Sequence, residues 1–412
     1  MSLPRVVVTG WGIVSPVGIG EEKSWQSLIE GRSGIDRITQ FDATQFDSQI
    51  AGEVKDFDPS FLSLRERKRI PRFVQFALHC TEQAIQNSNL AIERIDPYRI
   101  GVIVGAGIGS LRTIEKEYKT FIEKGPSKIS PFLIPKLITN EAAGSIAIHF
   151  NLKGVNFCTV SACASGAHAI GEAFRYIQQG KVDVVIAGGT ESCITPLGVG
   201  GFCALKALST RNDEPQRASR PFDKNRDGFV IGEGAGIVVL EELNFAKKRK
   251  ADIKAEVIGY GTTCDAYHIT APSPDGEAAS YAMELALKEG RVAIGEPLYI
   301  NAHGTSTSLN DKVETKAIKR TLGSYAKKIL VSSTKSTMGH TLGAAGAIEF
   351  IVCCLAVRDK IVPPTINYEE PDPECDLNYT PNYAREYDFK VAISNSLGFG
   401  GHNVALVVKE FK

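Results

Sequence analysis

The chain contains 412 residues, 43% of them hydrophobic and 23% charged, so it is long enough for at least two packed domains and lacks the composition of a disordered protein. Lysine plus arginine number 47 and aspartate plus glutamate also number 47, a balance that excludes a global basic surface for nucleic acid. Nine cysteines without CxxC or cysteine–histidine zinc spacing indicate a reducing compartment and no metal site.

The sequence predicts neither a membrane segment nor a targeting peptide. Two uncharged stretches, 154–171 and 391–408, are interrupted by polar residues and are expected to be buried core rather than membrane spans. The chain passes from Met1 almost directly into an apolar strand at 6–8. We therefore expect a cytoplasmic protein without a signal or transit peptide.

Short β-branched runs alternate with helical patterns along the chain. Strands are expected at 6–9, 100–104, 155–160, 182–186 and 237–240, and helices at 73–87 and 166–179. This alternation is typical of an α/β fold whose strands are buried between layers of helices.

The second part of the chain repeats features of the first part in the same order. Residues 6–12 resemble residues 256–261, and residues 99–105 resemble residues 297–304. The glycine-rich run at 232–236 resembles the run at 398–402. The turn at Cys163 corresponds to residues 332–340, which lead into a predicted helix at 341–350. In this correspondence His340 takes the position that the thiol has in the first half. We predict two similar halves, 1–250 and 251–412, joined through the charged connector 241–256.

Cys163 lies in the sequence VNFCTVSACASG (155–166), where an apolar run ends and a helix rich in small residues begins. A thiol at this turn meets the positive end of the helix dipole, which favours the thiolate and predicts a lowered pKa. The small neighbours allow close approach by a substrate. On these residues alone, a reactive nucleophile and a buried structural cysteine are both open.

The repeat makes three other side chains candidate site residues: His303, His340 and Lys335. Taken singly, each histidine could be an ordinary core or loop residue, and the lysine could be solvated. If two similar halves bring their strand ends and turns together, however, a thiol, two imidazoles and an amine share one pocket.

Several motifs of the chain resemble those of the elongating type II β-ketoacyl-acyl carrier protein synthases. They are SACASGAH (161–168), NAHGTST (301–307), KSTMGHTLGAAG (335–346) and NSLGFGGHN (395–403), with further matches at 188–209 and 220–236. The resemblance spans essentially the whole chain. It implies a thiolase-like αβαβα sandwich of two pseudo-symmetric halves. It also implies a decarboxylative Claisen condensation of a malonyl group with an acyl group on Cys163, in fatty acid elongation. No bound cofactor is implied, because acyl carrier protein holds the substrates on its phosphopantetheine.

By this resemblance, Cys163, His303 and His340 form the catalytic triad. A cysteine thiolate exchanges thioesters with little loss of free energy, and two neutral imidazoles can donate hydrogen bonds to an enolate oxygen. The helix dipole is expected to keep His340 neutral. Lys335 would position His340 through its charge, with Glu349 as the counter-charge, because an isolated buried ammonium is costly. The alternative for Glu349 is a solvated helix residue.

The resemblance assigns further roles around the substrate. The backbone N–H groups of Cys163 and Phe399 would bind the oxyanion. The side chains implied in substrate binding are Thr305 and Thr307 for the phosphopantetheine amides, Phe202 and Phe399 at the entrance for the acyl chain, Ile108 in the acyl tunnel, and Thr270.

Acyl carrier proteins are acidic, so a neutral partner needs a local basic patch. The sequence SLRERKR (63–69) predicts docking through Arg65, Lys68 and Arg69, although a plain solvated surface is the alternative. Lys128 and Lys206 match docking positions in relatives.

The resemblance also predicts a homodimer, with Phe132 and Leu133 reaching the neighbouring tunnel, and no nucleic acid partner.

One residue departs from the family pattern: His402 stands where the usual residue is threonine, and we expect this change to alter loop packing more than chemistry. Other members of the superfamily fit less well. A thiolase needs a second cysteine in the glycine loop at 398–402, and an initiating synthase has asparagine where this chain has His340. A non-catalytic chain-length partner, which would lack Cys163, and a polyketide-type ketosynthase are the alternatives kept.

Overall fold

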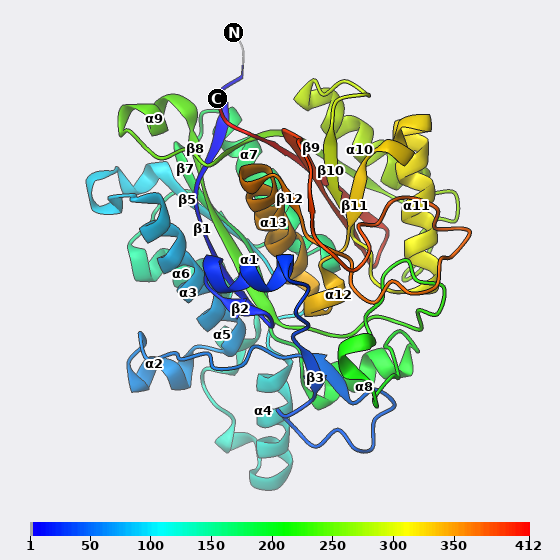
Figure 1. Cartoon of the computed structure of the whole chain (residues 1–412). Coiled ribbons are helices and arrows are strands. Elements are labelled where there is room, and N and C mark those ends of the chain that lie inside the picture. Colours follow the sequence, from blue (N-terminus) through cyan, green and yellow to red (C-terminus); the bar gives the residue numbers. More distant parts are fainter. Residues whose placement is uncertain (1–2) are drawn as a thin grey trace.

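The computed structural model describes residues 3–412, and one sheet runs through the centre of the molecule (Figure 1). Its strand order is β11-β10-β14-β15-β9-β1-β8-β7-β5-β6, with the short β2 (Gly18–Ile19) beside β1. The strands of the first half are β1 (Val6–Ser15), β5 (Ile100–Gly105), β6 (Asn156–Phe157), β7 (Val184–Glu191) and β8 (Gly234–Glu242). Those of the second half are β9 (Ala255–Cys264), β10 (Leu298–Asn301), β11 (Leu330–Ser332), β14 (Val391–Gly398) and β15 (His402–Lys409).

The two halves of the sheet mirror one another. In the first half β1 pairs antiparallel with β8, β8 antiparallel with β7, and β7, β5 and β6 are parallel. In the second half β9, β15, β14, β10 and β11 follow the same sequence of pairings. The halves meet where β1 pairs antiparallel with β9 over three residues of each strand. The predicted duplication is therefore a property of the fold, while a boundary at residues 250 and 251 stays a prediction.

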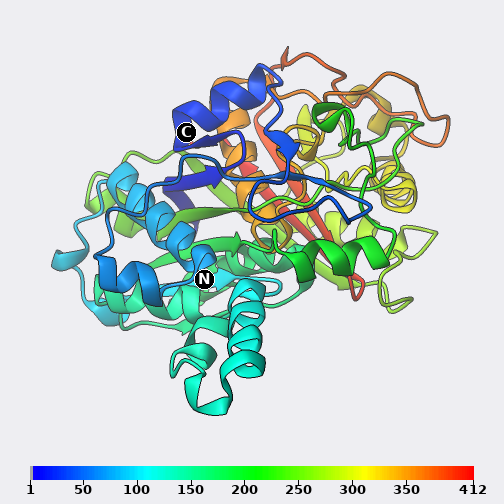
Figure 2. The same ribbon diagram turned by 90° about the horizontal axis from the view of Figure 1, so that it is seen from below.

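Helices form three layers around the two halves of the sheet (Figures 1 and 2). Helices α3 and α6 cover the outer face of the first half, and α10 and α11 cover the outer face of the second. Helices α7 and α13 pack against each other between the halves. This is the αβαβα sandwich that the resemblance implied. The longer helices are α3 (Arg72–Ser88), α4 (Leu111–Lys124), α6 (Glu141–Phe150), α7 (Ser165–Gln178), α10 (Glu277–Gly290), α11 (Ser308–Leu322) and α13 (Ala345–Asp359).

Shorter elements complete the surface and the loops. The remaining helices are α1 (Glu21–Ile29), α2 (Leu64–Arg69), α5 (Leu133–Leu137), α8 (Pro196–Ala204), α9 (Leu243–Lys248) and α12 (Lys335–Met338). Two small hairpins pair β3 (Ile35–Arg37) with β4 (Ile50–Gly52) and β12 (Ile361–Val362) with β13 (Arg385–Glu386).

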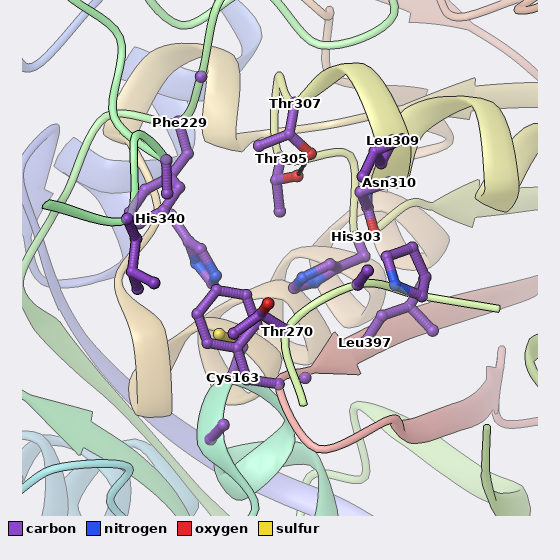
Figure 3. A pocket seen from close by; sticks show the side chains of 18 of the residues that line it. Cys163, Phe229, Thr270, His303, Thr305, Thr307, Leu309, Asn310, His340 and Leu397 are labelled. Carbon is purple, nitrogen blue, oxygen red and sulfur yellow. Dashed lines mark hydrogen bonds between the residues drawn. The ribbon is translucent and has the colours of Figure 1, made fainter. Parts of the chain in front are cut away.

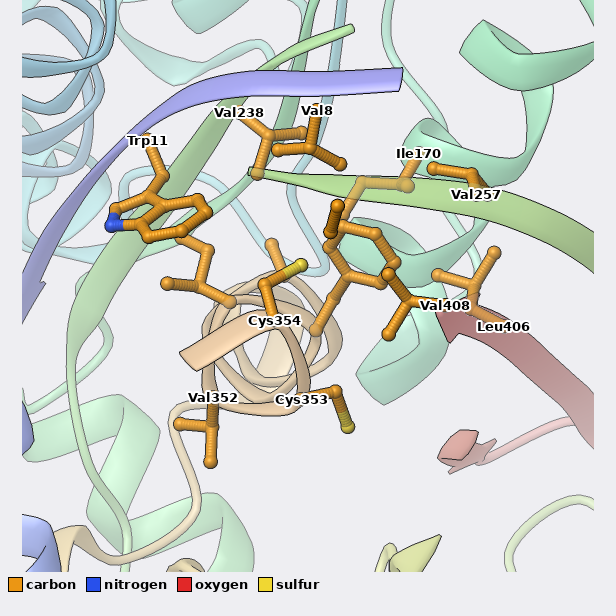
Figure 4. Close-up of a cluster of buried hydrophobic side chains, with 14 of the residues drawn as sticks. Val8, Trp11, Ile170, Val238, Val257, Val352, Cys353, Cys354, Leu406 and Val408 are labelled. Atoms are coloured by element: carbon orange, nitrogen blue, oxygen red, sulfur yellow. The ribbon is translucent and has the colours of Figure 1, made fainter. Parts of the chain in front are cut away.

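Residues 345–357 of α13 are buried on all sides in the middle layer, and apart from Glu349 they are apolar or small. Figure 4 shows Cys353 and Cys354 on this helix among side chains from both halves of the sheet. Small residues let α7 and α13 approach closely: a Cβ on Gly346 would lie 2.7 Å from the Cβ of Ala167. The stretch of small residues that follows each turn in the sequence is thus explained by packing at the centre.

Several sequence expectations need correction. The predicted strand at 155–160 pairs only over Asn156–Phe157, because the chain then leaves the sheet and Ser161 N–H donates to the Ser165 hydroxyl at 2.9 Å. The predicted helix at 341–350 begins later, with a 3₁₀ turn at 342–344 before α13. The connector 241–256 contains the end of β8, helix α9 and the start of β9.

The structural equivalent of Cys163 is not His340. The 3₁₀ turns before α7 and α13 begin with Ala162 and Leu342, and both residues have a φ of 51°. Cys163 therefore corresponds to Gly343, and His340 precedes that position by three residues. The two halves repeat the turn, but the imidazole enters the site from the segment before it.

Within residues 3–412, no helix has both the length and the apolar character needed to cross a bilayer. The expectation about the extreme N-terminus falls on Met1 and Ser2, which lie outside the described residues.

Candidate active site

A cavity of about 410 Å³ lies between the halves, where the turns after β5, β10 and β14 meet the turn before α7. The predicted site residues that line it are Ile108, Cys163, Phe202, Lys206, Thr270, His303, Thr305, Thr307, His340 and Phe399. Residues from opposite ends of the sequence are thus brought together at one place.

Cys163 lies in the 3₁₀ turn 162–164 that precedes α7, with its side chain half-buried. Burial raises the pKa of its thiol to about 12, although Lys335 and the backbone N–H of Phe399 act in the opposite direction. The expectation of a lowered pKa from the helix dipole is therefore wrong for the protein without substrate. Removing the thiol from water outweighs the dipole, so Cys163 is protonated at neutral pH.

Both imidazoles point into the space beside Cys163 (Figure 3). The ring centroids of His303 and His340 are 5.2 Å apart, and the rings are nearly perpendicular. His303 follows β10, and its backbone N–H donates to Glu314 on α11 at 2.8 Å. His340 follows α12, and its backbone N–H donates to the carbonyl of Val230 at 2.7 Å. Each ring is therefore held by a backbone segment that is tied to a neighbouring element.

His340 is a neutral hydrogen-bond donor toward the cavity. Its Nδ1 accepts from the backbone N–H of Leu342 at 3.3 Å, so the proton of the neutral ring is on Nε2. Burial lowers the pKa of His340 well below its usual range, and the positive charge of Lys335 adds to this effect. The same two causes lower the pKa of His303, with a smaller contribution from His340. The neutral state was expected for His340, but its main cause is burial rather than the helix dipole.

Lys335 and Glu349 form a fully buried ion pair behind the histidines, with each side chain 1% exposed. Lys335 begins α12, and Glu349 is on the first turns of α13. Burial raises the pKa of Glu349 to about 7, although Lys335 opposes the rise. The carboxylate keeps the ammonium in place, and the positive charge of the ammonium adds to the effect of burial, which is the main reason that both imidazoles are neutral.

Comparisons with known proteins agree with this geometry. Residues 4–246 match the family model "Beta-ketoacyl synthase, N-terminal domain", and residues 254–369 match "Beta-ketoacyl synthase, C-terminal domain". The chain belongs to the β-ketoacyl synthase family. It is 52% identical over 409 residues to the 3-oxoacyl-[acyl-carrier-protein] synthase 2 of Synechocystis sp., covering 99% of this chain and 98% of the relative. It is 52% identical to the protein of the same name from Coxiella burnetii, covering 99% of each chain.

Solved structures of β-ketoacyl synthases and ketosynthases have the same fold. A ketosynthase from Burkholderia phymatum STM815, described as a beta-ketoacyl synthase, superimposes with a TM-score of 0.92 at 35% identity, over 99% of this chain and 100% of that chain. A structure described as a type II polyketide acyl-carrier protein in complex with its ketosynthase gives a TM-score of 0.93 at 37% identity, over 100% of both chains.

In this member of the β-ketoacyl synthase family, Thr305 and Thr307 face the cavity from the loop between β10 and α11. Their alternation in the sequence would put both hydroxyls on one side of an extended segment, but Ser306 between them has a φ of 67°, so the segment is not extended. The two hydroxyls nevertheless meet, with 2.9 Å between their oxygens. Asp311 on α11 fixes the loop by accepting the N–H of Thr305 at 3.0 Å.

The apolar end of the cavity lies beside the thiol. Ile108, Cys163 and Phe202 pack against one cluster of buried apolar residues that includes Phe229 and Leu342. Such a wall can hold a hydrocarbon chain attached to the sulfur, because it removes the chain from water.

Phe399 lies on the turn between β14 and β15 and lines the same cavity as Cys163. There is no room for a side chain on the preceding residue: a Cβ on Gly398 would lie 2.8 Å from the carbonyl oxygen of Ser161 and 3.3 Å from the nitrogen of Cys163. Gly398 thus permits the backbone to pass close to the reacting sulfur.

His402 packs beside this turn rather than against the sulfur. Its ring lies 6.2 Å from that of His168 and close to Gly400. His402 also pairs with Cys264 on the neighbouring strand β9. These contacts agree with a packing role, and its effect on the chemistry stays a prediction.

The predicted docking residues lie on the surface. Arg65, Lys68 and Arg69 are exposed on α2, and Arg69 stacks over the ring of Phe132 at 4.6 Å. Lys128 is exposed in the turn after α4.

Lys206 differs from the other predicted docking residues because it lies at the rim of the cavity. Its ammonium pairs with Asp47 at 2.7 Å, and this pair reduces the charge that Lys206 offers to a partner.

Three buried carboxylates near the site were missed from the sequence. Glu314 accepts the backbone N–H groups of His303 and Gly304, both at 2.8 Å, and Asp311 holds Thr305. Glu191 at the end of β7 binds the loop that contains Ile108. Acidic residues on a helix or at a strand end usually contact solvent, so the sequence offered little to distinguish these three.

Proposed function

We propose that this protein catalyses the condensation of an acyl group, carried on Cys163, with a malonyl group on acyl carrier protein. The products are carbon dioxide and a 3-oxoacyl group on the carrier protein, longer by two carbons, as in fatty acid elongation. The observation that supports this most strongly is the meeting of one half-buried, protonated thiol and two neutral imidazoles in a single cavity beside an apolar wall.

In the first step, the sulfur of Cys163 attacks the thioester of the acyl carrier protein. A new thioester bond forms, and the phosphopantetheine sulfur leaves with the proton that the buried thiol gives up. The exchange replaces one thioester by another, so its free energy change is small. The backbone N–H groups of Cys163 and Phe399 stabilise the oxyanion of the tetrahedral intermediate.

In the second step, the bond between the malonyl carboxylate and its α-carbon breaks, and the electron pair moves into an enolate. The imidazoles of His303 and His340 donate hydrogen bonds to the enolate oxygen. They can do so at neutral pH without delivering a proton, because burial and Lys335 hold both rings neutral. The α-carbon then attacks the acyl thioester, and the sulfur of Cys163 leaves as a thiolate, which takes up one proton from water.

Thr305 and Thr307 are proposed to bind the phosphopantetheine arm through their hydroxyls. Ile108 and Phe202 are proposed to contact the acyl chain, with Thr270 and Phe399 at the entrance. No cofactor enters the proposed steps, since the substrates arrive on the carrier protein.

The proposed partner is an acidic acyl carrier protein that docks on the basic face of α2. The solved relative described as an acyl-carrier protein in complex with its ketosynthase supports this type of partner. Arg65, Lys68, Arg69 and Lys128 offer exposed positive charge, and such charge chiefly raises the association rate.

We further propose a homodimer in the cytoplasm. Large apolar side chains are exposed on α4, α5 and α6, and α4 projects from one side of the molecule (Figure 1). Helix α5 contacts both α4 and α6, and exposed apolar side chains on neighbouring helices are typical of an interface. Phe132 and Leu133 lie at the start of α5, next to this surface.

The proposed function is tested with purified protein, malonyl-acyl carrier protein and a series of acyl-acyl carrier proteins, with products read by mass spectrometry. We expect each accepted acyl chain to gain one two-carbon unit. Cys163→Ala should abolish product, while Cys264→Ala, a change at an exposed cysteine, should not. Condensation by Cys163→Ala would contradict the proposal, and repeated extension of one chain would favour a polyketide-type enzyme.

A further inference from the structure

Glu191 is a buried carboxylate that the proposed steps do not use. We propose that it is a positioning residue for acyl-chain selectivity, because it fixes the loop that presents Ile108 against the turn that presents Leu342. This inference rests on the proposed function, since it concerns the same acyl pocket.

Glu191 ends strand β7, and four backbone N–H groups donate to its carboxylate. Three come from consecutive residues of the loop after β5: Gly107 at 2.7 Å, Ile108 at 3.2 Å and Gly109 at 3.2 Å. The fourth is Gly343 at 3.3 Å, in the turn before α13. One side chain therefore ties a loop of the first half to a turn of the second half.

The glycines around Glu191 leave space for its carboxylate and for little else. A Cβ on Gly107 would lie 2.8 Å from its Oε2, and a Cβ on Gly343 would lie 2.7 Å from the same oxygen. On the other side of the loop, a Cβ on Gly109 would lie 2.6 Å from the carbonyl oxygen of Leu137, and Gly109 has a φ of +83°. The loop is thus held from two sides, and its position depends on the carboxylate.

The donors to Glu191 are neutral backbone groups. Its side chain is fully buried, and across residues 3–412 no lysine, arginine or histidine forms an ion pair with it. The Cys193 sulfur is its remaining contact, 3.5 Å from Oε1. A charge-assisted hydrogen bond is roughly twice as strong as a neutral one. Burial raises the pKa of Glu191 to about 7, although the N–H groups of Gly107, Gly109 and Gly343 oppose the rise, so the carboxylate is ionised above neutral pH. In that state both oxygens accept N–H groups, whereas glutamine keeps one accepting oxygen and turns an NH₂ donor toward the remaining N–H groups.

Both residues that Glu191 positions belong to the apolar wall beside the nucleophile. Ile108 packs against the same cluster as Cys163, and Leu342 is a member of that cluster. Both line the cavity. A shift of the loop would change the depth and width of the space for the acyl chain, whereas a shift of the turn would also move the Leu342 N–H that donates to His340. Discrimination between chains in such a pocket is set by individual methylene contacts.

The test measures the rate at which short, medium and long acyl-acyl carrier proteins load Cys163, read as intact protein mass, separately from condensation. In Glu191→Gln we expect the ratio of loading rates between the best and the worst chain to change by about tenfold or more. In the background of Ile108→Ala, Glu191→Gln should change that ratio much less, because the carboxylate acts through Ile108. Glu191→Asp, which keeps the charge but shortens the reach, provides the same test if the glutamine variant does not fold.

The matched control is Glu241→Gln, since Glu241 is equally buried on β8 but binds Thr9 and Arg249. It should lower thermal stability and leave the ratio unchanged. The inference is overturned if the Glu191 variants slow all chains by one common factor, or if Glu241→Gln shifts the ratio equally. If the Glu191 variants change the ratio of acyl-chain loading rates but no condensation follows loading in the unmodified protein, the proposed function fails and this inference stands.

Discussion

The buried pair of Lys335 and Glu349 gives the prediction with the largest expected effect on stability. Both side chains are 1% exposed, so removal of one partner leaves an uncompensated charge in the middle layer. Loss of one partner from a buried pair costs about 3–5 kcal/mol in the free energy of unfolding. Lys335→Met and Glu349→Leu should each show a loss of this size. The double variant should recover most of it, because apolar side chains can replace a buried pair at little cost.

Urea denaturation at pH 8, where the carboxylate of Glu349 is ionised, measures these free energies. The fluorescence of Trp11 and Trp25 follows unfolding, since both side chains are buried. The control is Lys319→Met, which removes a half-exposed pair with Asp376 and should cost less than about 1 kcal/mol. Single variants within about 1 kcal/mol of the unmodified protein, or a double variant that sums both losses, would refute the reasoning.

Three further predictions concern the nucleophile, the docking face and the loop beside the site. Because burial raises the pKa of Cys163 to about 12, its thiolate fraction grows with pH across the whole range below that value. Alkylation of Cys163 by iodoacetamide should therefore accelerate about tenfold per pH unit from pH 7 to 10. A rate that reaches a plateau near pH 8 would contradict this prediction. Arg65→Glu combined with Lys68→Glu should raise KM for acyl-acyl carrier protein and weaken its salt dependence with kcat preserved, while an unchanged KM would remove α2 from the docking face. His402→Thr should leave the pH optimum of acyl transfer in place, and a large shift would show that its imidazole acts on the thiol.

The sequence was informative where a residue type was unusual for its surroundings. Glu349 is a lone carboxylate in an apolar helix, so a buried partner was the natural expectation, and the structure pairs it with Lys335. The layered fold followed from apolar runs in repeated order, because strands and helices without charge must be buried on all sides.

The sequence was misleading where the environment is set by distant segments. The pKa of Cys163 is raised by burial among segments that are distant in the sequence, and the local helix gave the wrong direction. Glu191 and Glu314 resemble solvated residues in the sequence, but backbone N–H groups of loops far along the chain turn toward them. Such sites form where segments distant in the sequence meet in the folded chain, and the local sequence pattern carries little information about which segments meet.

The most direct measurement of the central claim is to load the protein with an acyl group, locate it and then discharge it. After incubation with acyl-acyl carrier protein, peptide mass spectrometry should find the acyl group on the peptide that contains Cys163. Addition of malonyl-acyl carrier protein should then remove it, with one carbon dioxide and one 3-oxoacyl product per group discharged. An acyl group on another residue, or product formed while Cys163 stays acylated, would contradict the account.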